Sequence, residues 1–316
     1  MGAVIAEDGP DAGVPWHYGD PGAEQRLLES GSGIVDLSHR GVLTIAGPDR
    51  LSWLHSLSTQ HLEGLQPGES STALLLGPTG HIEHVLQLVD DGETVWAHTE
   101  PGRVGDLVAF LESMRFMLRV EVTDRTEQLG IVWQPGTPPA GRITRSGEDS
   151  LGGYESFVPR DHLSDYLDQP EQRAGTWAYE ARRIAAGVPR VFVDTDHRTI
   201  PNEIGLLGTH LEKGCYRGQE TVARVHTLGR PPRRLVLLHL DGSVDALPER
   251  GAELTLGDKT VGFVGSSVRH HELGPIGLGL IKRNVPVDAT LAAGEISAAQ
   301  QVLVDPEVGL HVRARL

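Results

Sequence analysis

The pattern of apolar and polar positions predicts alternating strands and helices in the first half of the chain. Residues 42–45 alternate as a strand does, and Gly47-Pro48-Asp49 then offers a turn with an aspartate placed as a helix N-cap. Leucines at helical spacing predict a helix that continues to Ser58. Further elements are predicted downstream: strands at 72–76, 84–89, 94–98 and 119–123, and a helix at 104–111.

Turn signals between these elements indicate the fold class. Asp91-Gly92 is a favoured pair for a tight hairpin between two of the strands. Strands with hairpins and interposed helices predict an α+β fold with helices on one sheet face. Between residues 134 and 153 the composition shifts to Pro, Gly, Ser and Thr, which cannot bury enough apolar surface to order strongly. We expect a long connection there.

The second half of the chain changes from helical to strand-like patterns. A helix is predicted from about Ala174 to Ala186, because Gly187-Val188-Pro189 is a usual helix stop. After Gly229-Arg230-Pro231-Pro232, short apolar runs alternate with Gly and Pro, which predicts a small all-β barrel or sandwich. These runs lie at 235–240, 252–256, 260–264, 277–281 and 302–304.

Three parts of the chain follow from these patterns. Residues 1–30 precede the part of the sequence with a periodic apolar pattern and are predicted to form a flexible N-terminal leader. Residues 31–228 are predicted to form two α+β lobes joined by the connection at about 134–153. Residues 229–316 are predicted to form the C-terminal β-barrel domain.

The charge balance limits the classes of partner. The chain of 316 residues has 28 Lys and Arg against 43 Asp and Glu, a formal net charge of -15. Such a surface repels phosphate backbones and anionic lipid headgroups, so general nucleic-acid binding and membrane binding are not expected. Cations gather only between Lys213 and Arg234.

One cysteine limits the kinds of metal and redox site. A single Cys excludes an internal disulfide and a multi-cysteine metal site, and it favours a reducing, cytoplasmic location. The N-terminus has no targeting pattern, and no apolar run approaches the ~20 residues that span a bilayer. No metal site is expected: His81 and His84 lack a third identifiable ligand, and His270-His271 on a strand would point to opposite faces.

The segment from Lys213 to Glu220 is the strongest candidate for chemistry. Lys213 and Arg217 flank Cys215, and nearby cations favour the reactive thiolate. Gly214 and Gly218 leave the backbone open to close approach. The alternative is that Cys215 is a small buried apolar residue, as free cysteines often are; the charged neighbours argue against that position.

This segment resembles a known family motif. Lys213, Gly214, Cys215, Tyr216, Gly218, Gln219 and Glu220 match every fixed letter of the KGCYxGQE segment of YgfZ-type proteins. Further stretches look like segments of the wider YgfZ/GcvT family, which includes the glycine-cleavage aminomethyltransferase. They are Asp36-Leu37-Ser38-His39, Gly47-Pro48-Asp49, 183–189, Pro201-Asn202-Glu203 and 262–266, and together they span roughly residues 30–316.

The resemblance implies a fold, a ligand and a set of site residues. The expected fold is a three-lobed disc around a central channel for tetrahydrofolate. Glu203 is implied as a bidentate acceptor for the pterin and Tyr179 as a stacking aromatic, although each has a structural alternative, as a surface acid or a core ring. Arg224 is implied at the glutamate tail of folate or in a pair with Glu220. Arg40 falls where some relatives carry an aromatic.

The resemblance also implies a function. We expect a tetrahydrofolate-binding factor in iron-sulfur protein assembly, maintenance or repair, with a link to iron-sulfur-dependent tRNA modification, that contacts iron-sulfur client or assembly proteins through Cys215. The alternatives are a folate-dependent aminomethyl transferase and a thiol oxidoreductase. The first lacks the acidic pair of true aminomethyltransferases, because Glu83-His84 stands in its place. The second lacks a resolving cysteine.

Overall fold

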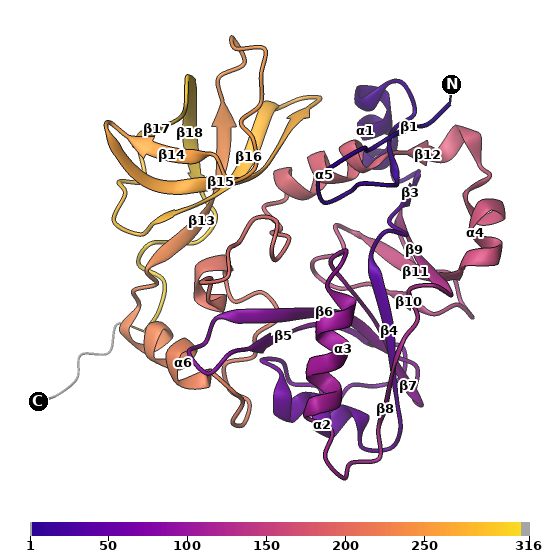
Figure 1. The fold of residues 1–316 in the computed structure, drawn as a ribbon. Helices are drawn as coiled ribbons and strands as arrows, with labels where there is room; N and C mark the ends of the chain where they lie inside the picture. The colour runs from indigo at the N-terminus through magenta and orange to yellow at the C-terminus, as the bar shows by residue number, and fades with distance from the viewer. Residues whose placement is uncertain (1, 311–316) are drawn as a thin grey trace, which may run out of the picture. The chain divides into compact units, whose positions relative to one another are not determined.

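Two compact units make up the computed structural model, which describes residues 2–310. Unit 1 holds the residues up to Leu75, His84–Tyr179 and Gly208–Tyr216. Unit 2 holds Leu76–Glu83, Glu180–Leu207 and the chain from Arg217 onward. Each unit is therefore assembled from separate stretches of the chain, whose helices and strands are labelled in Figure 1.

The N-terminal stretch is ordered in the described residues, so the prediction of a flexible leader was wrong. It forms strands β1 (Val4–Ile5) and β2 (Pro15–His17) and helix α1 (Pro21–Glu29). The Asp20 carboxylate caps α1 by accepting the Ala23 N–H at 2.9 Å. Leu28 is fully buried. The Glu24 carboxylate accepts the Gly175 N–H at 2.8 Å, which ties α1 to a distant part of unit 1.

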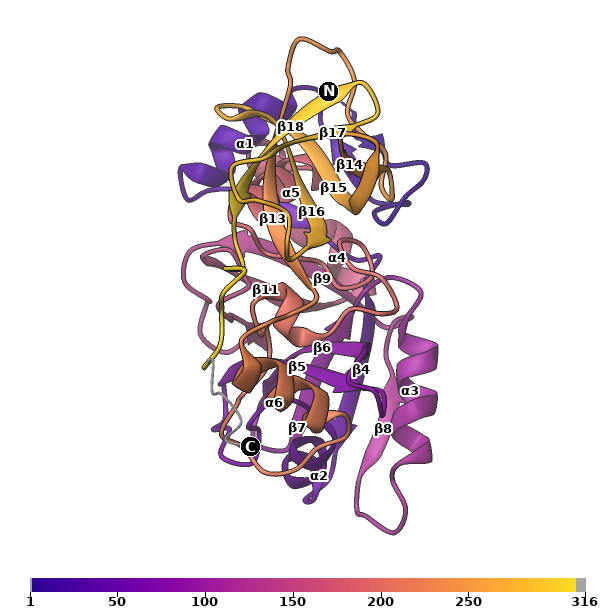
Figure 2. The same cartoon turned by 90° about the vertical axis from the view of Figure 1, so that its left-hand side faces the viewer.

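A five-stranded sheet with two helices on one face forms much of unit 1. Its order is β5 (Ser70–Leu76), β6 (Ile82–Asp90), β7 (Thr94–Thr99), β4 (Gly41–Ala46) and β8 (Glu121–Asp124). Helices α2 (Arg50–Leu57) and α3 (Val104–Ser113) bury their apolar sides with Leu43 and Ile45 in one core, and α3 runs beside β8 in Figure 2. The predicted strands, helices and hairpin are confirmed here.

Asp49 departs from its predicted role. It stands at the N-cap position of α2, but its carboxylate binds the Arg119 guanidinium, with Nη2 and Oδ1 2.7 Å apart, and makes no capping bond among the described residues. Both oxygens of the Asp49 carboxylate accept hydrogen bonds from Arg119, from its backbone N–H and from its guanidinium, and are therefore satisfied without a cap bond.

The second sheet of unit 1 contains the stretch predicted as a long connection. Its order is β10 (Thr144–Arg145), β11 (Gly153–Pro159), β9 (Leu129–Pro135), β3 (Ile34–Asp36) and β12 (Arg173–Ala174), and α4 (Arg160–Leu167) packs on it. Arg145 is fully buried and pairs with Asp149 and Glu155. These carboxylates outweigh burial and raise the pKa of Arg145. The predicted connection therefore contains part of a buried charge cluster, which its composition did not indicate.

Unit 2 contains the predicted β-barrel, which the structure confirms. The barrel closes in the order β13 (Arg233–Leu240), β16 (Gly274–Lys282), β15 (Lys259–His270), β14 (Glu253–Leu256), β17 (Thr290–Ala293) and β18 (Ile296–Val302). Buried aliphatic residues such as Val236, Leu238 and Ile281 fill its interior. The pattern missed β17, and the run expected at 302–304 begins where β18 ends.

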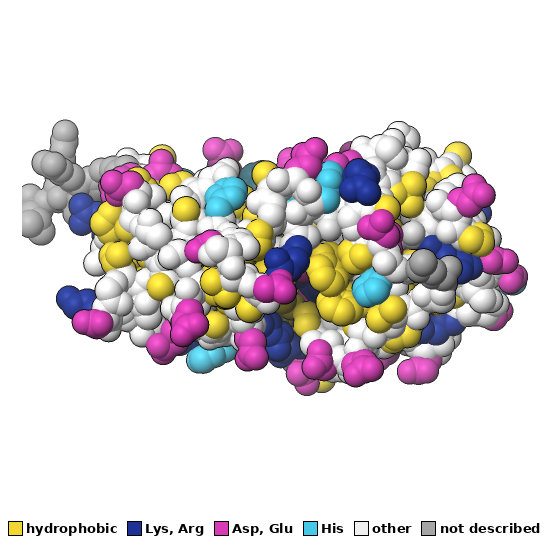
Figure 3. All heavy atoms as spheres, turned by 90° about the horizontal axis from the view of Figure 1, so that it is seen from above, with side chains coloured by type: hydrophobic (Ala, Val, Ile, Leu, Met, Phe, Trp, Pro, Cys, Tyr) yellow, Lys and Arg dark blue, Asp and Glu magenta, His cyan; other side chains and the backbone are white. Residues whose placement is uncertain are grey.

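Three further helical segments complete the described elements that matter for the site. They are α5 (Thr176–Ala185), the 3-10 turn η2 (Pro201–Ile204) and α6 (Gln219–Leu228). Helix α5 corresponds to the helix expected at 174–186. None of the helices in the described part of the chain is both long and apolar enough to cross a membrane. Acidic side chains are scattered over the face in Figure 3 instead of forming one patch.

Candidate functional site

The segment around Cys215 displays its thiol to solvent. Residues 214–216 form neither helix nor strand, and Cys215 is exposed. Its neighbours alternate sharply, because Lys213 and Tyr216 are buried whereas Gly214 and Arg217 are exposed. The alternative of a buried apolar cysteine is therefore wrong.

Lys213 anchors this segment to the end of helix α2. Its Nζ donates to the backbone carbonyls of His55 and Ser58, the latter at 2.5 Å. The ammonium also lies 5.0 Å from the centre of the Tyr216 ring, within cation–π range. Carbonyls at a helix C-terminus attract a cation. Burial nevertheless lowers the pKa of Lys213 to about 8.

Three histidine rings gather around this anchor. The ring centres of His55 and His61 are 4.9 Å apart, and those of His61 and His210 are 5.5 Å apart. The Leu62 N–H donates to His55 Nδ1 at 3.3 Å, so the neutral ring carries its proton on Nε2. Burial first, and then the Lys213 charge, lower the pKa of His55. The His55 ring therefore stays neutral and packs, and its tautomer does not suit a metal ligand at Nε2.

Arg217 and Tyr216 complete the flanks of the cysteine. Arg217 Nη1 lies 3.5 Å from Glu83 Oε2, and both side chains are partly exposed, so solvent screens the pair. Burial raises the pKa of Tyr216 to about 12, which keeps the phenol neutral. The two cations predicted to favour a thiolate at Cys215 thus both have oxygen partners of their own.

Glycine occurs at two positions of this segment for different structural reasons. Gly218 has φ +79°, and a Cβ there would lie 2.5 Å from the Gly77 carbonyl oxygen. That position tolerates glycine only, because the turn before β6 packs directly on the start of α6. A Cβ on Gly214 would meet no described atom within 4 Å. Gly214 therefore leaves open surface beside the thiol.

Helix α6 begins with the last two residues of the motif, Gln219 and Glu220. Glu220 Oε1 lies 3.0 Å from Nη2 of Arg224, one helical turn later. Both side chains are mostly exposed, so this pair is weak. The structure thus contains the pairing that the sequence left open for Arg224.

Glu203 lies in a buried ion cluster of unit 2. Arg233 Nε donates to Glu203 Oε1 at 2.8 Å, and Arg233 Nη2 donates to Oε2 at 2.9 Å. The Ile200 N–H also donates to Oε2, at 3.1 Å. Arg233 binds Asp196 as well, and its hydrogen bonds overcome the effect of burial and lower the pKa of Asp196. The carboxylate edge expected to bind a pterin bidentately is occupied by Arg233.

Tyr179 and Arg40 lie together in unit 1. The Arg40 guanidinium carbon is 5.8 Å from the centre of the Tyr179 ring, and the Trp133 ring meets that ring edge to face at 5.4 Å. Arg40 Nη1 donates to Gln87 Oε1 at 3.3 Å. The side chains of Arg40, Tyr179 and Trp133 are buried, and Gln87 is partly buried. The structure therefore brings two of the four predicted folate residues into contact.

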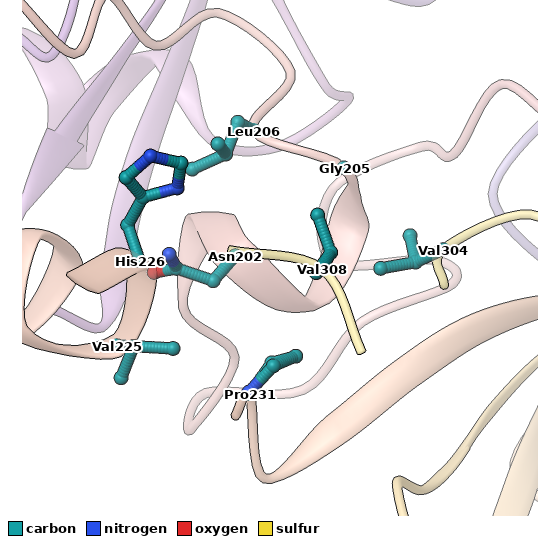
Figure 4. A pocket seen from close by; sticks show the side chains of 8 residues that line it. All are labelled: Asn202, Gly205, Leu206, Val225, His226, Pro231, Val304 and Val308. Carbon is teal, nitrogen blue, oxygen red and sulfur yellow. The ribbon is translucent and has the colours of Figure 1, made fainter. Parts of the chain in front are cut away.

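A small pocket in unit 2 lies beside η2 and α6. Residues of both elements and of the chain after β18 surround about 50 Å³ of space (Figure 4). The Asn202 Nδ2 group donates to the Val222 carbonyl at 3.2 Å, whereas its Oδ1 is buried without a partner among the described residues. The cavity has room for water, to which the Asn202 Oδ1 atom offers an acceptor.

Sequence reasoning missed the residues that hold the site together. Arg233 belongs to the cationic stretch between Lys213 and Arg234, but the sequence does not indicate that it binds Glu203 and Asp196. The carbonyls of His55 and Ser58 belong to the backbone, so the sequence does not show that they bind Lys213. A buried lysine or glutamate in a charged segment needs a partner, so the partner's existence was predictable although its identity was not.

Known proteins resemble this chain over most of its length. No protein-family model matches the sequence. A chloroplastic protein of Arabidopsis thaliana that is named as a transferase is 25% identical over 331 residues, which cover 93% of this chain and 74% of that protein. The mitochondrial iron-sulfur cluster assembly factor IBA57 homolog of Mycosarcoma maydis is 25% identical over 228 residues, covering 65% of this chain. The match spans 56% of the length of that relative.

A solved structure shares the fold. The glycine cleavage system aminomethyltransferase T of Bartonella henselae superposes with a TM-score of 0.78 at 17% sequence identity, covering 98% of this chain and 96% of that one. At this identity the likeness concerns the fold. The predicted aminomethyltransferase-like α+β fold with a C-terminal barrel is confirmed.

Proposed function

We propose that this chain, which resembles the YgfZ/GcvT family of aminomethyltransferase-like proteins, is a tetrahydrofolate-binding factor in the assembly, maintenance or repair of iron-sulfur proteins. Cys215 is the residue that contacts the client protein, its cluster or a small thiol. The support is an assembly factor among its relatives and a thiol displayed at the surface.

The exposed Cys215 thiol carries this proposal. Lys213 and Tyr216 turn their side chains inward on either side of it, so the segment is held while the thiol remains accessible. One thiolate cannot complete the ligand set of a cluster. Any cluster contact is therefore shared with a partner protein, a second copy or a small thiol. An exposed single thiol also suits a reducing compartment such as the cytoplasm.

The folate proposal rests on the fold and on a partial fit of the predicted residues. Bound tetrahydrofolate would carry a one-carbon unit on its ring nitrogens. The exposed Arg224 guanidinium suits the anionic tail of the ligand, because its pair with Glu220 is weak. Tyr179 and Arg40 stay the residues proposed for the ring system; both are buried in unit 1, so contact with a ligand requires these side chains to become accessible. Glu203 does not fit as a bidentate pterin ligand while Arg233 holds both its oxygens.

Cell rescue tests the role of the thiol. Cys215→Ser and Cys215→Ala are expected to melt like the wild type, because the side chain is exposed, and to bind tetrahydrofolate with unchanged affinity. Both variants should fail to restore iron-sulfur enzyme activity in cells that lack the native protein. Full rescue by Cys215→Ala, at wild-type protein levels, would remove the thiol from the function.

A transfer assay separates this function from that of an enzyme. The protein is incubated with tetrahydrofolate and a lipoyl carrier loaded with methylamine, and the released ammonia is measured. We expect no turnover, because Glu83-His84 stands in place of the acidic pair of true aminomethyltransferases. Steady turnover would overturn the assembly-factor proposal in favour of an aminomethyl transferase.

A further inference from the structure

The turn between α3 and β8 exposes three consecutive apolar side chains. Phe116 is 81% exposed, Met117 is 98% exposed and Leu118 is 41% exposed. Isolated exposed apolar residues are common, but a contiguous run of large ones marks an interaction site more often than chance exposure. We refer to residues 116–118 as the apolar tip.

Both ends of the turn are fixed, so the apolar tip is held in place. Trp53 Nε1 donates to the Met114 carbonyl at 3.2 Å at one end. At the other end, Arg119 donates from its backbone N–H and its guanidinium to the Asp49 carboxylate. The Leu118 N–H closes the turn on the Arg115 carbonyl at 3.1 Å. The apolar side chains are therefore presented on a preformed turn.

The backbone of the turn is unfavourable for the residue it carries. Phe116 has φ +49°, in the left-handed region that disfavours a residue with a Cβ. Glycine or asparagine would adopt this conformation at lower cost. Phe116 has a strained backbone and an exposed ring, so it does not stabilise the folded chain through packing. We infer that this residue serves binding to a partner instead.

Charge around the apolar tip favours one kind of partner. The two arginines at its base are neutralised locally, because Arg115 pairs with Glu112 and Arg119 pairs with Asp49. The chain as a whole carries a net charge of -15, which repels an anionic membrane and a second copy of itself. A protein with an apolar pocket and a basic surface around it complements both features.

We propose that the apolar tip is the docking element for a partner protein of the iron-sulfur pathway, with Phe116 and Met117 inserted into an apolar pocket rimmed by basic residues. Phe supplies a rigid anchor, and Met adapts to the shape of a pocket. The preformed turn lowers the ordering cost of binding. This inference rests on the proposed function, because that function names the class of partner.

Binding measurements with two acidic substitutions in the apolar tip test the inference. The probes are the apo forms of the scaffold and carrier proteins for iron-sulfur clusters from the same organism, each purified singly and titrated by calorimetry. We expect the wild type to bind at least one of them, and the double variant Phe116→Asp/Met117→Asp to bind it at least tenfold more weakly. Phe116→Leu/Met117→Leu should retain most of the affinity. Leu273→Asp, at a residue 46% exposed in the barrel, is the matched control and should change nothing.

The remaining outcomes overturn the inference and leave the proposed function testable. Equal affinity of wild type and double variant, or no binding to any probe, would exclude the tip as this docking element. Binding to vesicles of phosphatidylcholine, with or without phosphatidylglycerol, that the double variant loses would make it a membrane contact. Loss of a dimer in the double variant would make it a self-contact. In the cell-rescue assay, rescue by both wild type and double variant would sink only the inference, whereas no rescue by the wild type would sink the proposed function.

Discussion

Lys213 does not bind the residue that its position in the sequence suggests. It stands two positions from Cys215, yet its ammonium binds the carbonyls of His55 and Ser58. A flexible four-carbon stem lets a lysine reach partners far from its own backbone. Lys213 therefore acts on Cys215 by holding the segment, and Glu203 is likewise drawn away from a ligand role by Arg233.

The buried His98 ring makes the stability of the protein depend on pH. It is fully buried in β7, and neither ring nitrogen has a hydrogen-bond partner among the described residues. Burial, followed by the charges of Arg40 and Arg145, lowers the pKa of His98 well below its ordinary value of 6.5. The folded protein thus keeps the ring neutral, whereas the unfolded chain takes up a proton below pH 6.5. Stability from this residue is complete above pH 6.5 and is lost as the pH falls.

Urea unfolding at several pH values checks this prediction. Between pH 6.5 and 5, the free energy of unfolding of the wild type should fall relative to that of His98→Leu by up to about 1.4 kcal/mol per pH unit. Leucine removes the titrating ring at a similar volume. Parallel stability curves for the two proteins would show that His98 titrates normally in the fold.

At the scale of elements, the start of α6 depends on close packing against the turn before β6. The Gly77 carbonyl lies where a Cβ of residue 218 would be, and Gly80 is nearly as close. This contact connects the motif after Cys215 to a stretch far away in sequence. Glycine at 218 is therefore required by the packing of two elements and not only by the motif.

A matched pair of glycine substitutions tests that requirement. Gly218→Ala should lower the free energy of unfolding by about 2–5 kcal/mol, because it combines a left-handed backbone with a backbone clash. Gly214→Ala should change it by less than about 1 kcal/mol, since its Cβ would meet no described atom. Denaturant unfolding of both variants gives the comparison. Similar losses for the two would refute the packing argument.

At the scale of the whole molecule, the N-terminal residues belong to the core of unit 1. Val14 and Leu28 are buried, and the Glu24 carboxylate accepts N–H groups from both Tyr18 and Gly175. Separate stretches of chain therefore close one unit, as the division of both units shows. Composition alone gave the opposite expectation, a flexible leader.

Two truncations distinguish a leader from a structural element. Deletion of residues 2–30 should destabilise the protein by about 3–6 kcal/mol, because it removes two buried aliphatic side chains at about 1.5–3 kcal/mol each. Deletion of residues 2–8 removes only the exposed strand β1 and should have little effect. Thermal and urea unfolding provide the measurement. If both truncated proteins unfold like the wild type, the stretch is dispensable for folding.

Most of the regular local structure and the position of the candidate chemistry could be predicted from the amino-acid sequence. Apolar alternation located the strands of the first sheet of unit 1 and most strands of the barrel, since periodicity follows from backbone geometry, but it missed the second sheet of unit 1. The charged neighbours of Cys215 correctly predicted an exposed thiol. Only the tertiary structure decided which partners the long charged side chains take, as with Lys213, Glu203 and Arg145. Those choices depend on which distant backbone or charge is brought near, because a buried charge must be compensated wherever the fold supplies an opposite group.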